Sequence, residues 1–243
     1  MAWRAPSKIG GYVLAGGKSS RMGRDKALLE LAGKPLALHA VVKLRRVCEE
    51  VSILSNNPEL DAYAPLVPDL HEACGPLGGI EAGLAHSRYD WNLFMPVDMP
   101  FLPSAFLDYW IRKMVLAREQ HNGARIAMFR VEDAPQPALC LLHRDVAPYI
   151  SEAMGTGRYK TILVLEEAAR DLARRRGGPF AEVIFYLPWD EMSSFSTGPR
   201  TGESEAWWTV TEAQQAAKKL WFVNLNTPED FGEAEQHVGA LDT

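Results

Sequence analysis

The chain has 243 residues, of which 47% are hydrophobic, and it carries a formal net charge of -5. This length and apolar content suffice for one substantial core, so we expect a single α/β domain over residues 1–243 with an atypical extension at about 177–220. The acidic balance argues against a protein that binds nucleic acid through a basic surface, and three scattered cysteines without Cys-x-x-Cys spacing indicate neither a disulfide framework nor a zinc site.

The first predicted element is a buried strand at about residues 11–14, which runs into a polar loop rich in glycine. Gly16 and Gly17 allow the backbone to approach an anion with its N–H groups turned inward, and Arg21 and Lys26 add positive charge to the same loop. The loop is therefore predicted to bind a polyphosphate.

Two common nucleotide-binding loops do not fit this sequence. A P-loop would need a glycine where Tyr12 stands, and Ser19 and Met22 replace the second and third glycines of the dinucleotide fingerprint. The loop instead resembles the signature loop of nucleotidyltransferases that hold an NTP for attack on its α-phosphate, and most of all that of the molybdenum cofactor guanylyltransferases. The pattern that carries this resemblance is Leu14-Ala15-Gly16-Gly17-x-Ser19-x-Arg21-Met22-Gly23-x-Asp25-Lys26.

A crossover helix is predicted to begin at Pro35, because proline suits the first position of a helix. Leu36, Val41, Leu44 and Val47 recur at near-helical spacing, with three basic residues, Lys43, Arg45 and Arg46, on the other faces. The next predicted strand, residues 51–54, ends in the turn cluster 55–58, and ligands collect at this edge of open α/β sheets. The resemblance implies that Asn56 contacts the base or ribose; the alternative is that Asn56 only caps a turn.

A short third strand at 65–67 leads to Asp69, and a Gly-Pro-Leu-Gly-Gly segment at 75–79 then runs into a predicted helix. The family carries a similar segment beside the nucleotide, which implies a contact at Gly78. The alternative is a packing role, since Gly79 and Gly83 would let the helix lie close to a neighbour.

Residues 91–95 are predicted to form a central strand that ends in Pro96-Val97-Asp98-Met99-Pro100. An acid held between two prolines has the stiff frame that a metal ligand needs, and the family's Asp-x-Pro motif matches here. Asp98 is therefore the predicted Mg²⁺ ligand, with a cap for the helix at 104–118 as the alternative.

The second half of the chain shows weaker patterns. Gln136-Pro137 lies where the family tends to place an acceptor-side loop, and residues 193–204 contain too little apolar surface to pack, so a mobile surface loop is expected there. The predicted elements are strands at 125–131, 138–142 and 182–187, and helices at 146–154, 161–175 and 211–220.

The chain is predicted to close with a strand over residues 221–226, followed by Thr227 as helix N-cap and Pro228 at the first helical position. Asn224 and Asn226 would alternate onto one face of that strand. The resemblance to the family's closing Asn-x-Asn-Thr-Pro-Glu segment implies that both contact the acceptor, and strand-end hydrogen bonding is the alternative.

Together these features predict an α/β Rossmann-like three-layer sandwich with a mostly parallel sheet. The resemblance, which covers about residues 11–160 and 221–236, implies Mg²⁺-dependent transfer of GMP from GTP to the terminal phosphate of molybdopterin or its molybdenum-loaded form. A molybdenum cofactor chaperone or an apo-molybdoenzyme is a candidate partner. The predicted catalytic residues are Arg21, Lys26 and Asp98; the nucleotide contacts are Leu14, Ala15, Gly16, Gly17, Lys26, Asn56, Asp69, Gly78 and Asp98; the acceptor contacts are Asn224 and Asn226.

Two alternative functions stay open at this point. One is the same chemistry with another base or acceptor, as in cytidylyltransferases and sugar-phosphate nucleotidyltransferases, although the cytidylyl relatives read Leu-Ala-Ala-Gly where this chain has a glycine pair. The other is a nucleotide- or cofactor-binding protein without turnover. No apolar run approaches the roughly 18 residues of a membrane span, and the N-terminus lacks a signal-peptide core, so a cytoplasmic protein without membrane or nucleic-acid partners is expected.

Overall fold

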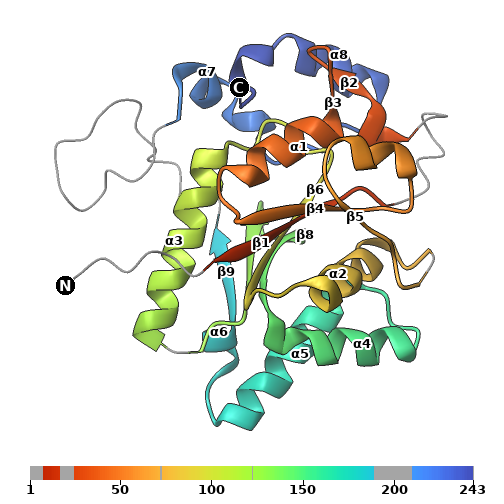
Figure 1. Ribbon diagram of the computed structural model, residues 1–243. Helices are drawn as coiled ribbons and strands as arrows, with labels where there is room; N and C mark the ends of the chain where they lie inside the picture. The colour runs from red at the N-terminus through yellow and green to blue at the C-terminus, as the bar shows by residue number, and fades with distance from the viewer. Residues whose placement is uncertain (1–7, 17–24, 72, 122, 189–209, 243) are drawn as a thin grey trace.

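The computed structural model describes residues 8–16, 25–71, 73–121, 123–188 and 210–242. A seven-stranded sheet lies between two layers of helices (Figure 1). The predicted three-layer α/β architecture is therefore confirmed.

The strands of the sheet lie in the order β5-β4-β1-β6-β8-β7-β9. The neighbours β5, β4, β1 and β6 are parallel, β8 runs antiparallel to β6 and β7, and β9 is parallel to β7. The mostly parallel sheet is thus confirmed, and its parallel strands all end at one edge. The bounds are β1 Ile9–Leu14, β4 Glu50–Leu54, β5 Leu66–Val67, β6 Trp91–Pro96, β7 Ile126–Val131, β8 Ala134–His143 and β9 Ile184–Pro188.

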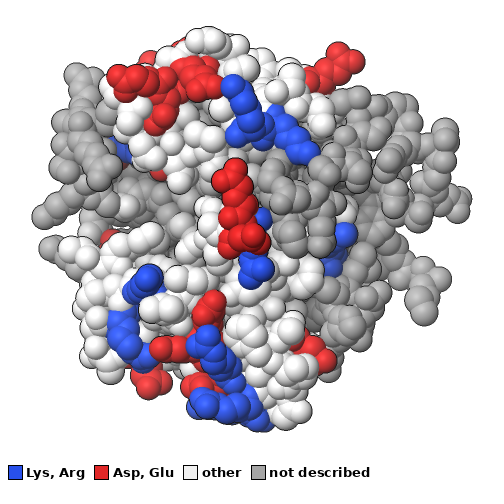
Figure 2. All heavy atoms as spheres, turned by 180° about the vertical axis from the view of Figure 1, so that it is seen from behind, with Lys and Arg blue, Asp and Glu red and all other residues white. Residues whose placement is uncertain are grey.

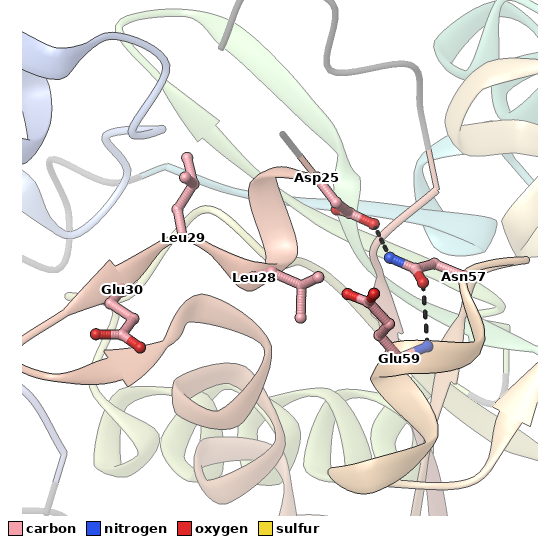
Figure 3. A pocket seen from close by; sticks show the side chains of 6 residues that line it. All are labelled: Asp25, Leu28, Leu29, Glu30, Asn57 and Glu59. Carbon is pink, nitrogen blue, oxygen red and sulfur yellow. Dashed lines mark hydrogen bonds between the residues drawn. The ribbon is translucent and has the colours of Figure 1, made fainter. Parts of the chain in front are cut away.

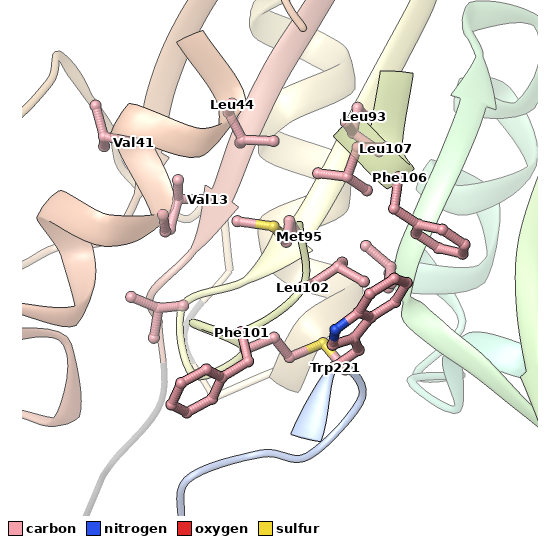
Figure 4. Close-up of a cluster of buried hydrophobic side chains, with 14 of the residues drawn as sticks. Val13, Val41, Leu44, Leu93, Met95, Phe101, Leu102, Phe106, Leu107 and Trp221 are labelled. Atoms are coloured by element: carbon pink, nitrogen blue, oxygen red, sulfur yellow. The ribbon is translucent and has the colours of Figure 1, made fainter. Parts of the chain in front are cut away.

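Each face of the sheet is covered by its own layer of helices, because the side chains of a strand alternate between the two faces. Val13 and Met95 face α1 (Leu36–Arg45) and α3 (Ser104–His121) in the cluster drawn in Figure 4. Tyr12 and Phe94 stack on the opposite face, in a second core with α2, α4 and α5. These three helices span Gly75–His86, Ala147–Gly155 and Thr161–Arg176.

Shorter elements complete the fold. A two-stranded hairpin, β2 (Glu30–Leu31) with β3 (Lys34–Pro35), precedes α1, and short helices connect or cover the larger elements. They are η1 Lys26–Leu28, η2 Pro58–Ala62, η3 Arg144–Val146, α6 Phe180–Val183, α7 Glu212–Ala216, η5 Lys218–Leu220, α8 Pro228–Glu235 and η6 Val238–Ala240.

Most predicted elements of the first half are present within a few residues of their expected bounds. Pro35 is the residue before α1 rather than its first residue, and α1 ends at Arg45, before Val47. Lys43 does not lie on an exposed face of that helix, because its side chain is only 1% exposed. Thr227 is the N-cap of α8 as predicted, and α8 and α7 both begin with a reciprocal capping box, at Thr227 and Thr211.

Two predictions in the second half are wrong. Residues 134–137 belong to β8 and are not a connection, since a turn at Glu132 and Asp133 already closes the β7–β8 hairpin. Residues 221–226 form no strand: a turn at Trp221 and Phe222 precedes irregular chain up to α8. The strand predicted at 182–187 is present as β9, although it begins at Ile184, after the short helix α6. The predicted loop 193–204 lies outside the described residues.

Charges of both signs are visible on the surface. On the face seen in Figure 2, basic and acidic side chains lie among one another and do not separate into one basic surface. No helix in the described part of the chain is both long and apolar enough to cross a membrane.

Candidate active site

The carboxyl ends of β1, β4, β5 and β6 meet at one edge of the sheet, and the predicted site residues follow these strands. Gly16 comes after β1, Asn56 after β4, Asp69 after β5 and Asp98 after β6. Because the four strands are parallel, residues far apart in the sequence are brought to this one edge. Gly17 and Arg21 lie outside the described residues, so their predicted contacts remain predictions.

Lys26 lies at the centre of the arrangement. Its Nζ is 2.5 Å from Asp98 Oδ2 and 2.7 Å from Asn226 Oδ1. The Lys26 and Asp98 side chains are each 17% exposed, so this ion pair is largely removed from water. Asp25 accepts a hydrogen bond from the backbone N–H of Ala27 and so caps the short helix η1, whose first residue is Lys26. The cap fixes the backbone that presents the ammonium group to the site.

The loop after β6 holds Asp98 by its backbone. The N–H of Val97 donates to the Leu14 carbonyl at 3.1 Å, and the N–H of Leu225 donates to the Asp98 carbonyl at 3.0 Å. Of the two carboxylate oxygens, Oδ2 accepts from Lys26, whereas Oδ1 is buried and makes no hydrogen bond with the part of the chain that the structure describes. A buried carboxylate oxygen without a donor is unfavourable, and a cation would satisfy it.

Asp98 therefore fits a magnesium ion. Mg²⁺ is usually held by one or two carboxylates together with substrate phosphates and water, so a site that depends on the nucleotide needs few protein ligands. No cluster of three or more His, Cys, Asp or Glu side chains suited to a metal occurs among the described residues. Asp98 is the acid that would hold the ion.

The two predicted acceptor residues lie beside Lys26, although not on a strand. Asn224 and Asn226 are both exposed, with the buried Leu225 between them. Asn226 Nδ2 donates to the Asn224 carbonyl at 3.2 Å, while the Asn226 backbone N–H donates to Asp230 Oδ2 at 2.7 Å. This backbone hydrogen bond is the main cause that lowers the pKa of Asp230. The start of α8 thus fixes Asn226 against Lys26.

Asp69 and Asn56 form a second polar group near Gly16. Asn56 Oδ1 accepts from the backbone N–H of Asp69 at 3.1 Å, so Asn56 does stabilise the local loop, as the turn alternative expects. A Cβ placed on Gly16 would lie 3.4 Å from Asp69 Oδ2, which puts this carboxylate directly beside the Gly-rich loop. Asp69 Oδ1 is buried without a hydrogen-bond partner among the described residues, and burial raises the pKa of Asp69. Asp69 is therefore placed to accept from a ligand.

The other predicted nucleotide contacts are less clearly set up for binding. The Ala15 N–H donates to the Leu54 carbonyl at 3.2 Å and Leu14 lies within the ladder of β1, so free amides for phosphate must come from Gly16 onwards. A Cβ on Gly78 would lie 3.1 Å from Cys74 Cβ. The packing alternative explains Gly79 and Gly83. A Cβ on Gly79 would lie 2.9 Å from a methyl group of Leu14, and a Cβ on Gly83 would lie 2.6 Å from the Phe94 ring.

Two polar residues that were not among the predicted site residues also lie at this edge. Asn57 Nδ2 donates to Asp25 Oδ2 at 2.6 Å, which ties the end of β4 to the residue before Lys26 (Figure 3). Both line a cavity of about 580 Å³. In the sequence, each of them directly adjoins a predicted site residue: Asp25 precedes Lys26, and Asn57 follows Asn56. The cavity is lined by Asp25, Leu28, Leu29, Glu30, Asn57 and Glu59.

Comparison with known proteins agrees with this geometry. The family described as the MobA-like NTP transferase domain matches residues 11–172. A molybdenum cofactor guanylyltransferase from Serratia proteamaculans is 34% identical over 174 residues, which cover 68% of this chain and 84% of the relative. One from Vibrio atlanticus is 33% identical over 198 residues, which cover 79% of this chain and 97% of the relative.

Solved structures share the fold at lower identity. The molybdopterin-guanine dinucleotide biosynthesis protein A from Archaeoglobus fulgidus superposes with a TM-score of 0.67 at 20% identity, covering 96% of this chain and 100% of that one. The 4-diphosphocytidyl-2C-methyl-D-erythritol synthase from Anaerococcus prevotii gives 0.58 at 11% identity, covering 96% of both chains. At these identities the two similarities concern the fold alone.

Proposed function

The chain belongs to the MobA-like NTP transferase family, and on that premise we propose that it transfers GMP from GTP to the terminal phosphate of molybdopterin and releases pyrophosphate. The names of the relatives support this substrate pair. The observation that carries the proposal is the contact of Lys26 with both Asp98 and Asn226, because it joins the predicted phosphate, metal and acceptor residues at one point.

The nucleotide would lie across the Gly-rich loop. The loop from Gly16 onwards and the Lys26 ammonium would hold the phosphates, with Arg21 as a further cation. Asp69 would accept a hydrogen bond from the guanine amino group, and the Asn56 side chain could serve the base or the ribose. The unpartnered Asp69 Oδ1 supports this role, since a donor from the ligand would satisfy it.

Asp98 would hold a magnesium ion. When bound there with the nucleotide, Mg²⁺ supplies positive charge that polarises the α-phosphate and stabilises the charge of the leaving pyrophosphate. Lys26, which pairs with Asp98, would then donate to a phosphate oxygen. The exchange of partners keeps both charged groups neutralised before and after the nucleotide binds.

The acceptor would approach from the side of Asn224 and Asn226. A phosphate monoester is largely ionised at neutral pH, because its second pKa is about 6. Its oxygen can attack the α-phosphorus directly: the new P–O bond forms as the bond to the pyrophosphate oxygen breaks, and no proton has to be removed. The reaction therefore requires mainly that the acceptor phosphate be positioned, and Lys26 and Asn226 would do this. A cofactor chaperone or an apo-molybdoenzyme would receive the product.

The test is release of pyrophosphate from GTP by the purified protein with Mg²⁺ and molybdopterin, with ATP and CTP in parallel. The proposal expects release that depends on GTP, metal and acceptor together. Preference for CTP would place the protein with the cytidylyltransferases. Binding of GTP and molybdopterin without any turnover would instead identify a protein that only binds the nucleotide or cofactor.

A further inference from the structure

A lysine outside the candidate active site is almost wholly buried. The Lys43 side chain, on α1, is 1% exposed. An ammonium group has three N–H donors and no acceptor, and leaving such a donor unpaired inside a protein is strongly unfavourable. The partners of Lys43 therefore indicate why a charge is kept at this position.

Two of its partners belong to the loop that carries Asp98. Lys43 Nζ donates to the Pro100 carbonyl at 2.9 Å and, in a short contact, to the Leu102 carbonyl. Both residues lie in the segment that joins β6 to α3, directly after Asp98. A side chain on α1 thus fixes the same loop whose other side is held by the hydrogen bond from Leu225 N–H to the Asp98 carbonyl.

The third partner is Asp242, close to the C-terminus of the chain. Its Oδ2 lies 3.1 Å from Lys43 Nζ and also accepts from the Ser104 N–H at 2.8 Å, while its Oδ1 accepts from Gln214 Nε2 at 3.0 Å. Burial alone would raise the pKa of Asp242, but the Lys43 charge and the Ser104 hydrogen bond lower it. The ammonium group therefore has a counter-charge that lets it stay inside the fold.

We propose that Lys43 is a positioning residue for Asp98: by holding the Pro100 and Leu102 carbonyls, it sets the loop so that the Asp98 carboxylate is oriented for the metal ion. An apolar side chain could fill the space on α1 but would leave both carbonyls without a donor. The inference rests on the proposed function, since it concerns the same carboxylate.

The variant must remove the hydrogen bonds without leaving a buried charge. Lys43→Met alone would take the nearer of two cations from the buried Asp242 and leave it only Arg46, 3.7 Å away, so the informative protein is the pair Lys43→Met with Asp242→Asn. Asp242→Asn alone is the first control. Burial lowers the pKa of Lys43, so without the Asp242 charge the amine can become neutral, and its two remaining N–H groups still reach both loop carbonyls. Arg125→Met is the second: it breaks an ion pair between the buried Arg125 and the partly exposed Asp145, 2.7 Å from Arg125 Nε to Asp145 Oδ2, at the opposite edge of the sheet.

Two readouts are measured on all four proteins. The first is amide hydrogen exchange at Val97 and Leu225, whose hydrogen bonds report the order of the loop. The second is the Mn²⁺ concentration for half-saturation in the presence of GTP. We expect faster exchange and an about tenfold higher Mn²⁺ requirement in the double variant alone, the usual effect of losing a group that orients a metal ligand. The KM for GTP should stay unchanged.

The outcomes separate the two proposals. If the double variant matches Asp242→Asn in both readouts, Lys43 does not position the loop. If Arg125→Met shifts the Mn²⁺ requirement equally, the effect is one of general stability and the positioning role is wrong. Failure of the proposed function would appear as absence of GTP turnover in the unaltered protein, whereas hydrogen exchange still decides whether Lys43 holds the Asp98 loop.

Discussion

Lys26 Nζ lies 2.7 Å from Asn226 Oδ1, although the two residues are 200 positions apart in the chain. The contact joins the loop after β1 to the segment before α8, and the same Nζ also reaches Asp98 after β6. Binding of a ligand to one of these three residues should therefore alter the contacts of the other two.

Asp98→Asn should abolish Mg²⁺-dependent turnover while the protein stays folded. The amide keeps the shape of the side chain but loses the charge that a metal ion needs, and the stabilisation that a metal ion supplies is worth several kcal/mol. Turnover at saturating GTP and circular dichroism are the measurements. Asp108→Asn, which removes an acid paired with Arg112 on α3, is the matched control and should remain active. Near-normal activity of Asp98→Asn would remove this residue from the site.

Lys26→Met should weaken GTP binding or turnover by about 1.5 to 3 kcal/mol, the range for loss of a hydrogen bond to a charged group. The change is measured as kcat/KM for GTP. Lys34→Met, at an exposed position of the β2–β3 hairpin, should have little effect. If affinity and rate were both unchanged in Lys26→Met, the interpretation of residues 14–26 as a phosphate loop would have to be abandoned.

Asn226→Ala should raise the KM for molybdopterin more than the KM for GTP. The substitution removes the side chain that contacts Lys26 but keeps the backbone N–H that donates to Asp230, so the start of α8 should persist. Loss of one hydrogen bond to a charged group again corresponds to about 1.5 to 3 kcal/mol. An equal effect on both KM values would mean that Asn226 acts only through Lys26 and does not meet the acceptor.

The central residues of this site could be found from the sequence because their signals are local. Lys26 ends a dense motif, and Asp98 lies between prolines directly after an apolar strand. The contact with Asn226, in contrast, depends on how the C-terminal segment crosses the sheet edge, which no local pattern specifies. Lys43 was expected on an exposed face of α1 for the same reason: its partners lie 57, 59 and 199 positions away.

The errors in predicted strands also have physical causes. Trp221 and Phe222 have high β propensity, but that preference is for a packed surface and not for a strand as such. Both rings pack against Phe106 of α3, and Trp221 Nε1 donates to the Gln214 carbonyl at 2.9 Å. In β8, Pro135 and Pro137 favoured the prediction of a loop, because proline cannot donate a hydrogen bond to a strand ladder. The register shift between Met128 and Arg130 of the partner strand β7 marks where the ladder beside them becomes irregular.

Asp69→Asn should make the protein more stable at neutral pH. Burial raises the pKa of Asp69, so the folded state binds a proton more tightly than the unfolded state. Stability contributed by this group is therefore greatest below its ordinary pKa of about 3.9 and falls as the pH rises through the folded-state value. Urea unfolding at a series of pH values from about 3 upwards should show an advantage of Asp69→Asn over the unaltered chain that begins to grow near the ordinary pKa of about 3.9 and levels off above the folded-state value. A difference that stays the same over the whole series would contradict the raised pKa.

The choice of base provides the last prediction, because it depends on the same carboxylate. Guanine presents an amino donor and a carbonyl acceptor on its edge; Asp69 can only accept when ionised, and the Asn56 amide can donate and accept. A buried site rejects a ligand that leaves such groups unpaired, at about 1 to 3 kcal/mol per group. GTP should therefore be used over ATP and CTP by at least about tenfold in kcat/KM, the lower end of that range.

Asp69→Asn sharpens this test, since it exchanges the acceptor for an amide at a position where the free carboxylate is unfavourable. The variant should bind GTP less well and discriminate less between GTP and ATP, while Mg²⁺ dependence persists because Asp98 is untouched. Retained preference for GTP in Asp69→Asn would show that another group reads the base. Equal use of CTP by the unaltered protein would assign it to the cytidylyl branch and leave the proposed roles of Lys26 and Asp98 in place.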